Sequence, residues 1–453
     1  MAIAHSVLAV LCLFSVLGGC AEGEQIGDSA ASSAQLQVLD DMGLHNLVLI
    51  HVDTLRADHM PWYGGARDTF PHLKRRPWMV VDGYTATSSW TASATASVLT
   101  GDTLAQHRVL WSDFDGIDIG GGAVNESLTL PTIADQLMTH GYATALFSGN
   151  AFVGPESGLN HGFTQTVEIP EGNRSTNAGQ LVRTALEWVD VQPEGTPLFM
   201  MLQPLDPHMP YSPADEDYGT WSNAADPLVS RDLPDNEMEE LYRTLIQDAS
   251  LREEARQEMV DLYDEQLLGL DRSIEQLLTG LESRGLLDDT LVVFAADHGE
   301  SLGDLEYEAF GHGKDYRPEV LRVPLMFLAP GLTDSHAECL SSGTDLAPTL
   351  LRAMGAPAMH NIEGAAMQDS CRETTFSSFF LPQGMLFASV RDSDEMVLAN
   401  CADGSLTGYD LDADVFGGAT FSAKDNTLLI ERVVDGVKAS ESLGNLNACA
   451  ELY

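Results

Sequence analysis

Short apolar runs alternate with longer stretches of helical spacing along most of the chain. Runs with the length and composition of buried strands occur at 47–52, 143–147, 198–202, 291–294 and 323–328. Helical spacing occurs at about 92–99, 128–138, 180–191 and 238–281. Strands that alternate with helices predict an α/β fold with a mostly parallel central sheet and helices on both faces.

The pattern changes in the last part of the chain. Beyond about Phe376 the apolar runs are short and β-like, with turns expected at Asp403-Gly404 and Asp435-Gly436. The acidic stretch 214–236 contains proline and is typical of a surface loop that shapes substrate access. We therefore expect a catalytic α/β domain over 44–375 and a small α+β subdomain over 376–453.

The N-terminus has the features of an export signal. An apolar run extends from Val7 to Leu17, which is too short for a comfortable membrane span. Leu17-Gly18-Gly19-Cys20 looks like a bacterial lipobox, with Cys20 as the lipidated residue; the alternative is a plain signal peptide with an incidental cysteine. We expect a signal peptide over 1–19, a flexible tether over 20–43, and an exported lipoprotein that contacts the membrane of the cell envelope only through its lipid anchor.

Charge and composition narrow the classes of partner. The 453 residues include 68 acidic and 23 basic side chains, which give a formal charge of −45, so binding to nucleic acid or to an anionic lipid surface is not expected. Hydrophobic residues make up 44% of the chain, enough for a large core, which excludes an acidic disordered protein.

Four cysteines lie in the last quarter of the chain, outside the leader. An even number of cysteines in an exported protein indicates disulfides, although four cysteines allow three pairings. Proximity in the sequence favours Cys339–Cys371 and Cys401–Cys449.

Two of the predicted strands end in candidate metal ligands. Asp53 follows the run at 47–52, and Asp297 and His298 follow the run at 291–294. Ligands of open α/β sheets bind beyond the carboxyl ends of the strands. A hard oxygen donor beside an imidazole suits a divalent cation, although Asp-His-Gly alone is also compatible with an ordinary turn.

Six short motifs stand in one order along the chain. They are VDTLRAD at 52–58, SWT at 89–91, ASVLTG at 96–101, DHGE at 297–300, HGK at 312–314 and RVP at 322–324. This order resembles the sulfatase family of the alkaline phosphatase superfamily, over roughly Asn46 to Leu411. The resemblance implies an alkaline-phosphatase-like fold with a small antiparallel C-terminal sheet, and makes Asp345 an N-cap of the helix that follows it.

The resemblance places Thr91 at the nucleophile position. Sulfatases usually have Cys or Ser there, within C/S-x-P-S-R, for conversion to formylglycine. Here the sequence is TASAT over 91–95, so formylglycine is not expected. A Thr hydroxyl bound to a divalent cation becomes a usable alkoxide near neutral pH. A helix N-cap is a structural role compatible with that function.

The expected metal ligands are Asp53, Thr91, Asp297 and His298. The family often has a second acid where this chain has Thr54, which argues against a four-carboxylate calcium site. The residues leave calcium, manganese, zinc and magnesium open.

Further motifs imply residues that contact the transferred group. His208, in a DPHxPY-like segment, would hold the anion or protonate the leaving group. Lys314 would contact an anionic oxygen, and His312 would act as a ligand or a leaving-group acid, the alternative being an exposed turn. Asn150 replaces a Lys and His pair of the family and is expected as a substrate donor. His107, Arg56 and Asp58 are expected to be structural.

Together these features predict a metal-dependent hydrolase of sulfate or phosphate esters, acting on a small-molecule, glycan or lipid ester. Thr91 favours phosphorus, because a formylglycine diol releases sulfate by breaking a carbon–oxygen bond, a route that Thr lacks. Two other functions remain open: a transferase of a phospho-substituent, and a non-catalytic binding protein on a sulfatase scaffold, which the TASAT sequence would permit.

Overall fold

The computed structural model describes most of the chain. The described residues are 29–112, 123–124, 128–169, 177–231, 233, 235–303, 310–313, 316–381, 384–401, 404–411, 420–421 and 426–440. The expected export signal, Cys20, Lys314 and Cys449 lie outside these ranges, so the expectations about them stay predictions.

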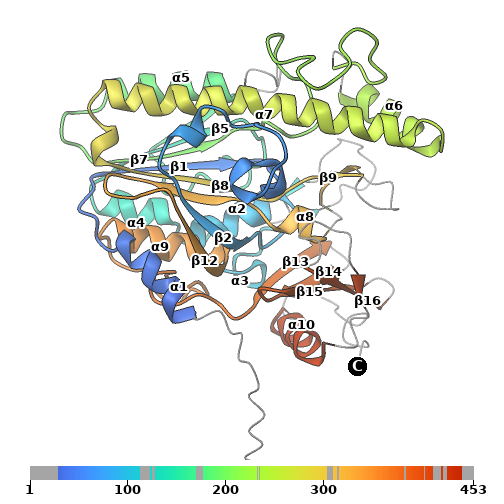
Figure 1. The fold of residues 1–453 in the computed structure, drawn as a ribbon. Helices are drawn as coiled ribbons and strands as arrows, with labels where there is room; N and C mark the ends of the chain where they lie inside the picture. The colour runs from blue at the N-terminus through green and yellow to red at the C-terminus, as the bar shows by residue number, and fades with distance from the viewer. Residues whose placement is uncertain are drawn as a thin grey trace, which may run out of the picture.

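An eight-stranded mixed sheet forms the centre of the molecule (Figure 1). In spatial order its strands are β12 (Ser335–Ser342), β2 (Met79–Thr85), β11 (Leu325–Leu328), β8 (Thr290–Ala296), β1 (Asn46–Val52), β7 (Leu198–Gln203), β5 (Ala143–Ser148) and β6 (Gln165–Glu168). Every neighbouring pair is parallel except the two that include β11. All residues of β1, β7 and β8 are buried, because both faces of the sheet are covered. The predicted mostly parallel sheet is confirmed.

Helices form a layer on each side of the sheet (Figure 1). On one face α5 (Asn177–Asp190) packs against α7 (Arg252–Ser283) and against β5 and β7. On the other face lie α2 (Thr91–Thr100), α4 (Ile133–Thr139) and α9 (Leu346–Ala353), in mutual contact. Apart from short 3-10 turns, the other described helices and strands outside the C-terminal subdomain are α1 (Ser29–Leu36), α3 (Leu104–His107), α6 (Asp235–Gln247), α8 (Pro318–Leu321), β3 (Trp111–Ser112), β4 (Ala123–Val124), β9 (Ser301–Leu302) and β10 (Phe310–Gly311).

Two expected helices differ from the structure for local reasons. The stretch 128–138 becomes helical only at Ile133, because Thr132 caps the helix by accepting a hydrogen bond from the amide of Asp135 at 3.2 Å. The stretch 238–281 is divided between α6 and α7. Between them the carboxylate of Asp248 accepts the amide of Ser250 at 2.9 Å, a local bond that competes with helix continuation.

Part of the expected tether packs on the fold. Residues 29–36 form α1, which contacts β12, and the side chains of Leu36 and Leu39 are fully buried. Asp40 also pairs with Arg352 at 2.6 Å. The flexible tether predicted over 20–43 is therefore wrong for this part, since two buried leucines give the segment a core contact that its Gly-, Ala- and Ser-rich composition does not reveal.

The C-terminal subdomain is an antiparallel sheet with one helix. Its strands are β13 (Thr375–Leu381), β14 (Gly384–Arg391), β15 (Glu395–Asn400), β16 (Ser405–Asp410) and β17 (Thr420–Phe421), and α10 (Thr427–Ala439) packs on β14 and β15. The turn predicted at Asp435-Gly436 is wrong, because both residues lie within α10. The antiparallel sheet itself is confirmed.

Asp345 lies at the N-cap position of α9 but does not cap that helix. Its carboxylate accepts the amide of Ser342 at 2.9 Å and forms an ion pair with Arg372 at 2.6 Å. The bond to Ser342 is half of a capping box for the 3-10 turn Gly343–Asp345, which runs directly into α9, so the predicted capping role is confirmed for that turn. The ion pair also joins the end of β12 to the segment before β13.

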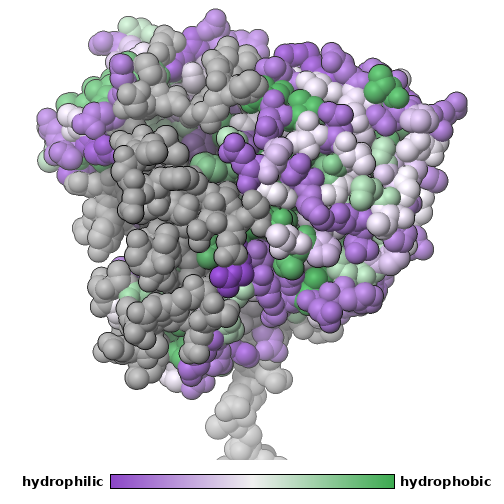
Figure 2. All heavy atoms as spheres, turned by 180° about the vertical axis from the view of Figure 1, so that it is seen from behind, coloured by the Kyte–Doolittle hydropathy of each residue, from purple (hydrophilic) through white to green (hydrophobic). Residues whose placement is uncertain are grey.

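The surface of the described residues is largely hydrophilic. On the face shown in Figure 2, hydrophilic residues cover much of the coloured surface, and hydrophobic residues lie between them in small groups. Within the described residues, none of the helices is both long enough and apolar enough to span a membrane.

The predicted disulfide between Cys339 and Cys371 is present. Cys401 is also disulfide-bonded, but its expected partner Cys449 lies outside the described residues. The first bridge joins β12 to the segment before β13 and spans 32 residues of sequence.

We expect the double variant Cys339→Ala/Cys371→Ala to be less stable than the oxidised wild type by about 3 to 4 kcal/mol, because the bridge restricts the unfolded chain. Chemical denaturation of the two oxidised proteins measures this difference. Equal denaturation midpoints and slopes would show that the bridge does not stabilise the fold.

Candidate active site

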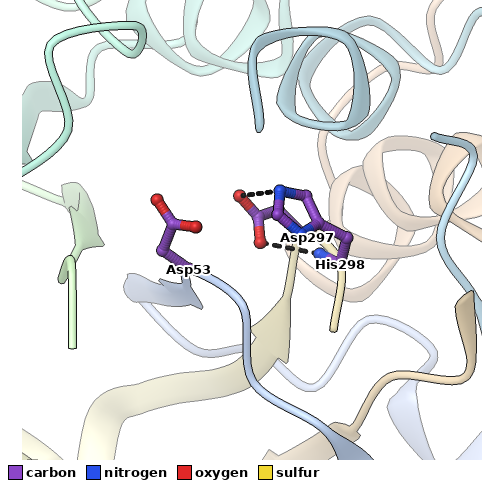
Figure 3. A group of neighbouring side chains, drawn as sticks. All are labelled: Asp53, Asp297 and His298. Atoms are coloured by element: carbon purple, nitrogen blue, oxygen red, sulfur yellow. Dashed lines mark hydrogen bonds and ion pairs between the residues drawn. The ribbon is translucent and has the colours of Figure 1, made fainter. Parts of the chain in front are cut away.

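Three potential metal ligands meet at the carboxyl edge of the sheet. Asp53 directly follows β1, and Asp297 and His298 follow β8, its parallel neighbour (Figure 3). One ligand atom from each side chain lies within 4.8 Å of the others, and all three residues are buried. The register of the two strands, which places Val52 opposite Ala296, sets the two carboxylates side by side.

The two carboxylates have different hydrogen-bond environments. Asp297 Oδ1 accepts the amides of Thr54 at 3.2 Å and of His298 at 2.6 Å. Thr54 has a φ of 54°, and this left-handed conformation accompanies an amide directed at Asp297. Asp53 Oδ2 accepts Asn150 Nδ2 at 2.5 Å, whereas its buried Oδ1 has no hydrogen-bond partner in the described part of the chain.

Burial dominates the electrostatics of the cluster. Burial and the adjacent charge of Asp297 raise the pKa of Asp53 well above its usual range, and burial raises the pKa of Asp297 to about 8. Burial, assisted by the charge of His312, lowers the pKa of His298 and so favours the neutral imidazole that ligates metals.

These residues fit a divalent cation. The unpartnered Asp53 Oδ1 needs a positive partner, because an unpaired buried carboxylate is costly. His298 Nδ1 lies 2.9 Å from the carbonyl oxygen of Gly299, to which it donates, so Nε2 is left as the ligating atom. Two carboxylates and one imidazole are compatible with several divalent ions.

Thr91 is the first residue of α2 and points into the cluster. Its Oγ1 lies 3.2 Å from His298 Nε2 and 3.5 Å from Asn150 Nδ2. The N-cap position belongs to Trp90, so the alternative role of Thr91 as the helix N-cap does not apply. The first amides of α2 lie at the same end of the helix and favour negative charge there.

Neighbouring segments hold the residues before Thr91 in place. The hydroxyl of Tyr316 accepts the amide of Ser89 at 3.1 Å and donates to the carbonyl of Ser378 at 3.0 Å. The amide of Gly313 donates to the carbonyl of Ser89 at 2.9 Å. These bonds connect the start of α2 to both the His312 loop and the C-terminal sheet.

Two further histidines lie beside the cluster. The ring centroid of His312 is 4.5 Å from that of His298 and 4.9 Å from that of His208. His312 Nδ1 lies 2.9 Å from Glu300 Oε1. Burial alone would lower the pKa of His312, but the charge and hydrogen bond of Glu300 outweigh it and raise the pKa.

The structure brings together seven of the eight expected catalytic, substrate-binding and metal residues: Asp53, Thr91, Asn150, His208, Asp297, His298 and His312. Lys314, the eighth, lies outside the described residues. His107 bonds Ser97 at 3.0 Å and Arg56 bonds Asp58 at 2.9 Å, as structural residues would.

Sequence reasoning assigned no role to three buried polar residues at the site: His51, Gln203 and Glu300, the last residue of the DHGE motif. His51 and Gln203 lie near the ends of apolar strands, and Glu300 directly follows Gly299. A polar residue at the end of an otherwise apolar strand was the feature of the sequence that could have indicated His51 and Gln203. Burial lowers the pKa of His51 to about 4, although its hydrogen bond with Gln203 acts in the opposite direction.

Known proteins resemble this chain in sequence and in fold. The phosphatidylethanolamine transferase Mcr-1 of Escherichia coli is 24% identical over 324 residues, which are 69% of this chain and 54% of that protein. A protein solved with its substrate D-glucosamine-2-N,6-O-disulfate matches with a TM-score of 0.69 at 18% identity, over 88% of this chain and 98% of the other. The phosphonate monoester hydrolase of Silicibacter pomeroyi matches with a TM-score of 0.64 at 19% identity, over 87% of this chain and 94% of the other.

The chain spans about half or less of the length of the curated relatives it matches. The sulfatase family model matches residues 45–356, which is more than half of the chain and includes every described residue of the site. This chain therefore belongs to the sulfatase family.

Proposed function

We propose that this protein is a metal-dependent hydrolase with Thr91 as its nucleophile, and that it prefers phosphate or phosphonate esters to sulfate esters. The observation that carries the proposal is the position of the Thr91 hydroxyl, 3.2 Å from His298 at the edge of the Asp53, Asp297 and His298 cluster. A nucleophile within reach of a metal-binding cluster and of a helix N-terminus is the arrangement that ester transfer requires.

Asp53, Asp297 and His298 would hold the ion, with Thr91 as the fourth ligand. When bound, a divalent cation supplies Lewis-acid chemistry and lowers the pKa of a hydroxyl beside it. The chain itself orients the nucleophile, because Thr91 begins a helix whose preceding residues are fixed by Tyr316. Asn150 Nδ2, 3.5 Å from Thr91 Oγ1, is placed to donate to an oxygen of the transferred group.

His312 is proposed as the acid for the leaving group. Glu300 accepts its Nδ1–H and stabilises the imidazolium, which leaves the Nε2 proton available. Thr91 reacts as the alkoxide, after its hydroxyl proton has been released to solvent. In the first step Thr91 Oγ forms a bond to phosphorus, the bond from phosphorus to the leaving oxygen breaks, and that oxygen takes the proton from His312. In the second step the oxygen of water forms a bond to phosphorus, a proton of that water passes to His312, and the bond from phosphorus to Thr91 Oγ breaks, which returns Thr91 as the alkoxide.

Thr91 also supports the preference for phosphorus. A formylglycine hydrate can expel sulfate by breaking its own carbon–oxygen bond. A Thr ester has no second hydroxyl on that carbon, so water must cleave it at phosphorus or sulfur. The fold is shared with a phosphonate monoester hydrolase and with a protein that binds a sulfated sugar, so the fold leaves both ester classes open.

A transferase is the second candidate, and the alignment with the phosphatidylethanolamine transferase over 69% of this chain favours it. A transferase would share the first step, and an alcohol would replace water in the second. Release of free phosphate or phosphonate without an added acceptor therefore distinguishes the hydrolase from the transferase.

The remaining expectations complete the proposal. Lys314 would contact an anionic oxygen of the ester, and His208, beside His312, would hold the transferred group. The substrate is an ester of a small molecule, glycan or lipid. We also propose that the protein is exported and anchored through Cys20, with no other contact to the membrane.

The first prediction concerns the metal. Protein stripped with a chelator should bind one divalent ion, and Asp53→Asn or Asp297→Asn should weaken binding at least about tenfold, because each removes a charged ligand. Isothermal titration with Mn²⁺ or Zn²⁺ measures this. Asp58→Asn is the control, because Asp58 lies in the same loop but pairs with Arg56. Unchanged affinity in both ligand variants would refute the assignment.

The second prediction concerns the nucleophile and the bond cleaved. On a panel of aryl phosphate, phosphodiester, phosphonate and sulfate esters, wild type should turn over a phosphorus ester fastest, and Thr91→Ala should lose about a thousandfold or more in kcat. Thr95→Ala removes another buried hydroxyl of α2, one turn further along, and should retain activity. Dominant sulfate turnover in wild type would reverse the substrate preference, and an active Thr91→Ala variant would exclude Thr91 as the nucleophile.

A further inference from the structure

Two polar residues form a hydrogen-bonded chain that ends at Asp297. His51 of β1 and Gln203 of β7 occupy adjacent strands, one position beyond the paired residues Ile50 and Leu202. His51 Nδ1 lies 2.9 Å from Gln203 Oε1, and Gln203 Nε2 lies 3.4 Å from Asp297 Oδ2. None of the three side chains is exposed. Gln203 thus connects β7 to the end of β8, on the far side of β1.

The chemistry of the end groups fixes the direction of every bond in this chain. A carboxylate accepts hydrogen bonds, so Gln203 must present its NH₂ group to Asp297 and its carbonyl oxygen to His51. The carbonyl oxygen can only accept, so His51 must carry its proton on Nδ1. Neither the amide of Gln203 nor the ring of His51 can be flipped without breaking a buried hydrogen bond.

We infer that Gln203 is a positioning residue for the metal ligand Asp297, and that His51 acts through Gln203 by holding its amide in the required orientation. Two backbone amides donate to Asp297 Oδ1. The side-chain amide of Gln203 donates to Oδ2, the other oxygen of the carboxylate. Gln203 therefore limits rotation of the carboxylate about its last bond, and His51 limits rotation of Gln203.

Asn150 provides a parallel at the other carboxylate. Its Oδ1 accepts the amide of Phe152 at 2.8 Å, which directs Nδ2 to Asp53 Oδ2. Each carboxylate of the cluster thus has one side-chain amide whose orientation is set by a third group. A ligand held in this way loses less conformational entropy when the ion binds, and outer partners of this kind typically affect metal affinity by about 10- to 100-fold.

The inference rests on the proposed metal site, and a double-variant cycle tests it. The proteins are wild type, Gln203→Met, His51→Leu and the double variant, each stripped of metal and titrated with Mn²⁺ by calorimetry. His107→Leu is the matched control, because His107 is also a buried histidine with a side-chain hydrogen bond, located on α3. It should lower Tm without changing the affinity for Mn²⁺.

We expect Gln203→Met to weaken Mn²⁺ binding about 10- to 100-fold and His51→Leu to weaken it less. The double variant should be no weaker than Gln203→Met alone, because His51 has no effect once its partner is absent. If Gln203→Met does not fold, His51→Ala, which has no donor for Gln203, should still weaken binding, and Gln203→Glu, which places a carboxylate instead of an amide beside Asp297, should not have wild-type affinity.

The outcomes separate the two proposals. A wild-type protein that binds no divalent ion contradicts the proposed metal site itself. A wild-type protein that binds Mn²⁺, with unchanged affinity in Gln203→Met, overturns the positioning role of Gln203. Two results would overturn the inference that His51 acts through Gln203. One is a loss of Mn²⁺ affinity in the double variant that equals the sum of the two single losses in free energy. The other is a loss of Mn²⁺ affinity in His107→Leu as large as that in His51→Leu.

Discussion

The site depends on two carboxylates that the sheet places side by side in a buried position. Asp53 and Asp297 follow adjacent parallel strands, and burial raises the pKa of both. Two ionised carboxylates buried side by side are costly, so without a positive partner one or both would be protonated. A divalent cation would remove this cost, and the surrounding polar groups orient the carboxylates and the hydroxyl of Thr91 beside them.

The nucleophile position depends on contacts that are distant in sequence. Tyr316 bonds both Ser89, which precedes α2, and Ser378 of the C-terminal sheet. The small C-terminal sheet therefore supports the loop that carries Thr91, in addition to covering part of the catalytic domain. Its aromatic contacts, such as Tyr316 with Phe379 at 6.1 Å, make this junction part of the main core.

The chain has a cluster that could bind a metal ion, and in our proposal Thr91 takes the place of the family's formylglycine. Asp53, Asp297 and His298 are placed as a metal cluster requires, whereas the sequence around Thr91 lacks the residues for formylglycine formation. A scaffold that had lost its function would have no reason to keep buried carboxylates that destabilise it in the absence of an ion. The retained cluster is therefore an argument against the binding-protein alternative and for a hydroxyl nucleophile.

The sequence alone predicted five of the eight central strands, the mostly parallel sheet and the positions of Asp53, Asp297 and His298, because apolar runs that end in polar residues locate the carboxyl edge of a parallel sheet. The position of Thr91 came from the resemblance to the sulfatase family. The sequence also predicted the Cys339–Cys371 bridge from proximity. It gave no role to His51 or Gln203, since an isolated polar residue in an apolar strand has no partner visible in sequence, and it gave none to Glu300, whose partner His312 is not visible in the DHGE motif. Only the tertiary structure decided those roles. The bond from His51 to Gln203 spans 152 residues of sequence and the bond from Gln203 to Asp297 spans 94, and the register between β1, β7 and β8 sets both distances. Glu300 is brought beside His312 by the segment between them. For the same reason the structure alone showed that α1 packs on the fold, where two leucines become buried only against β12 and its surroundings.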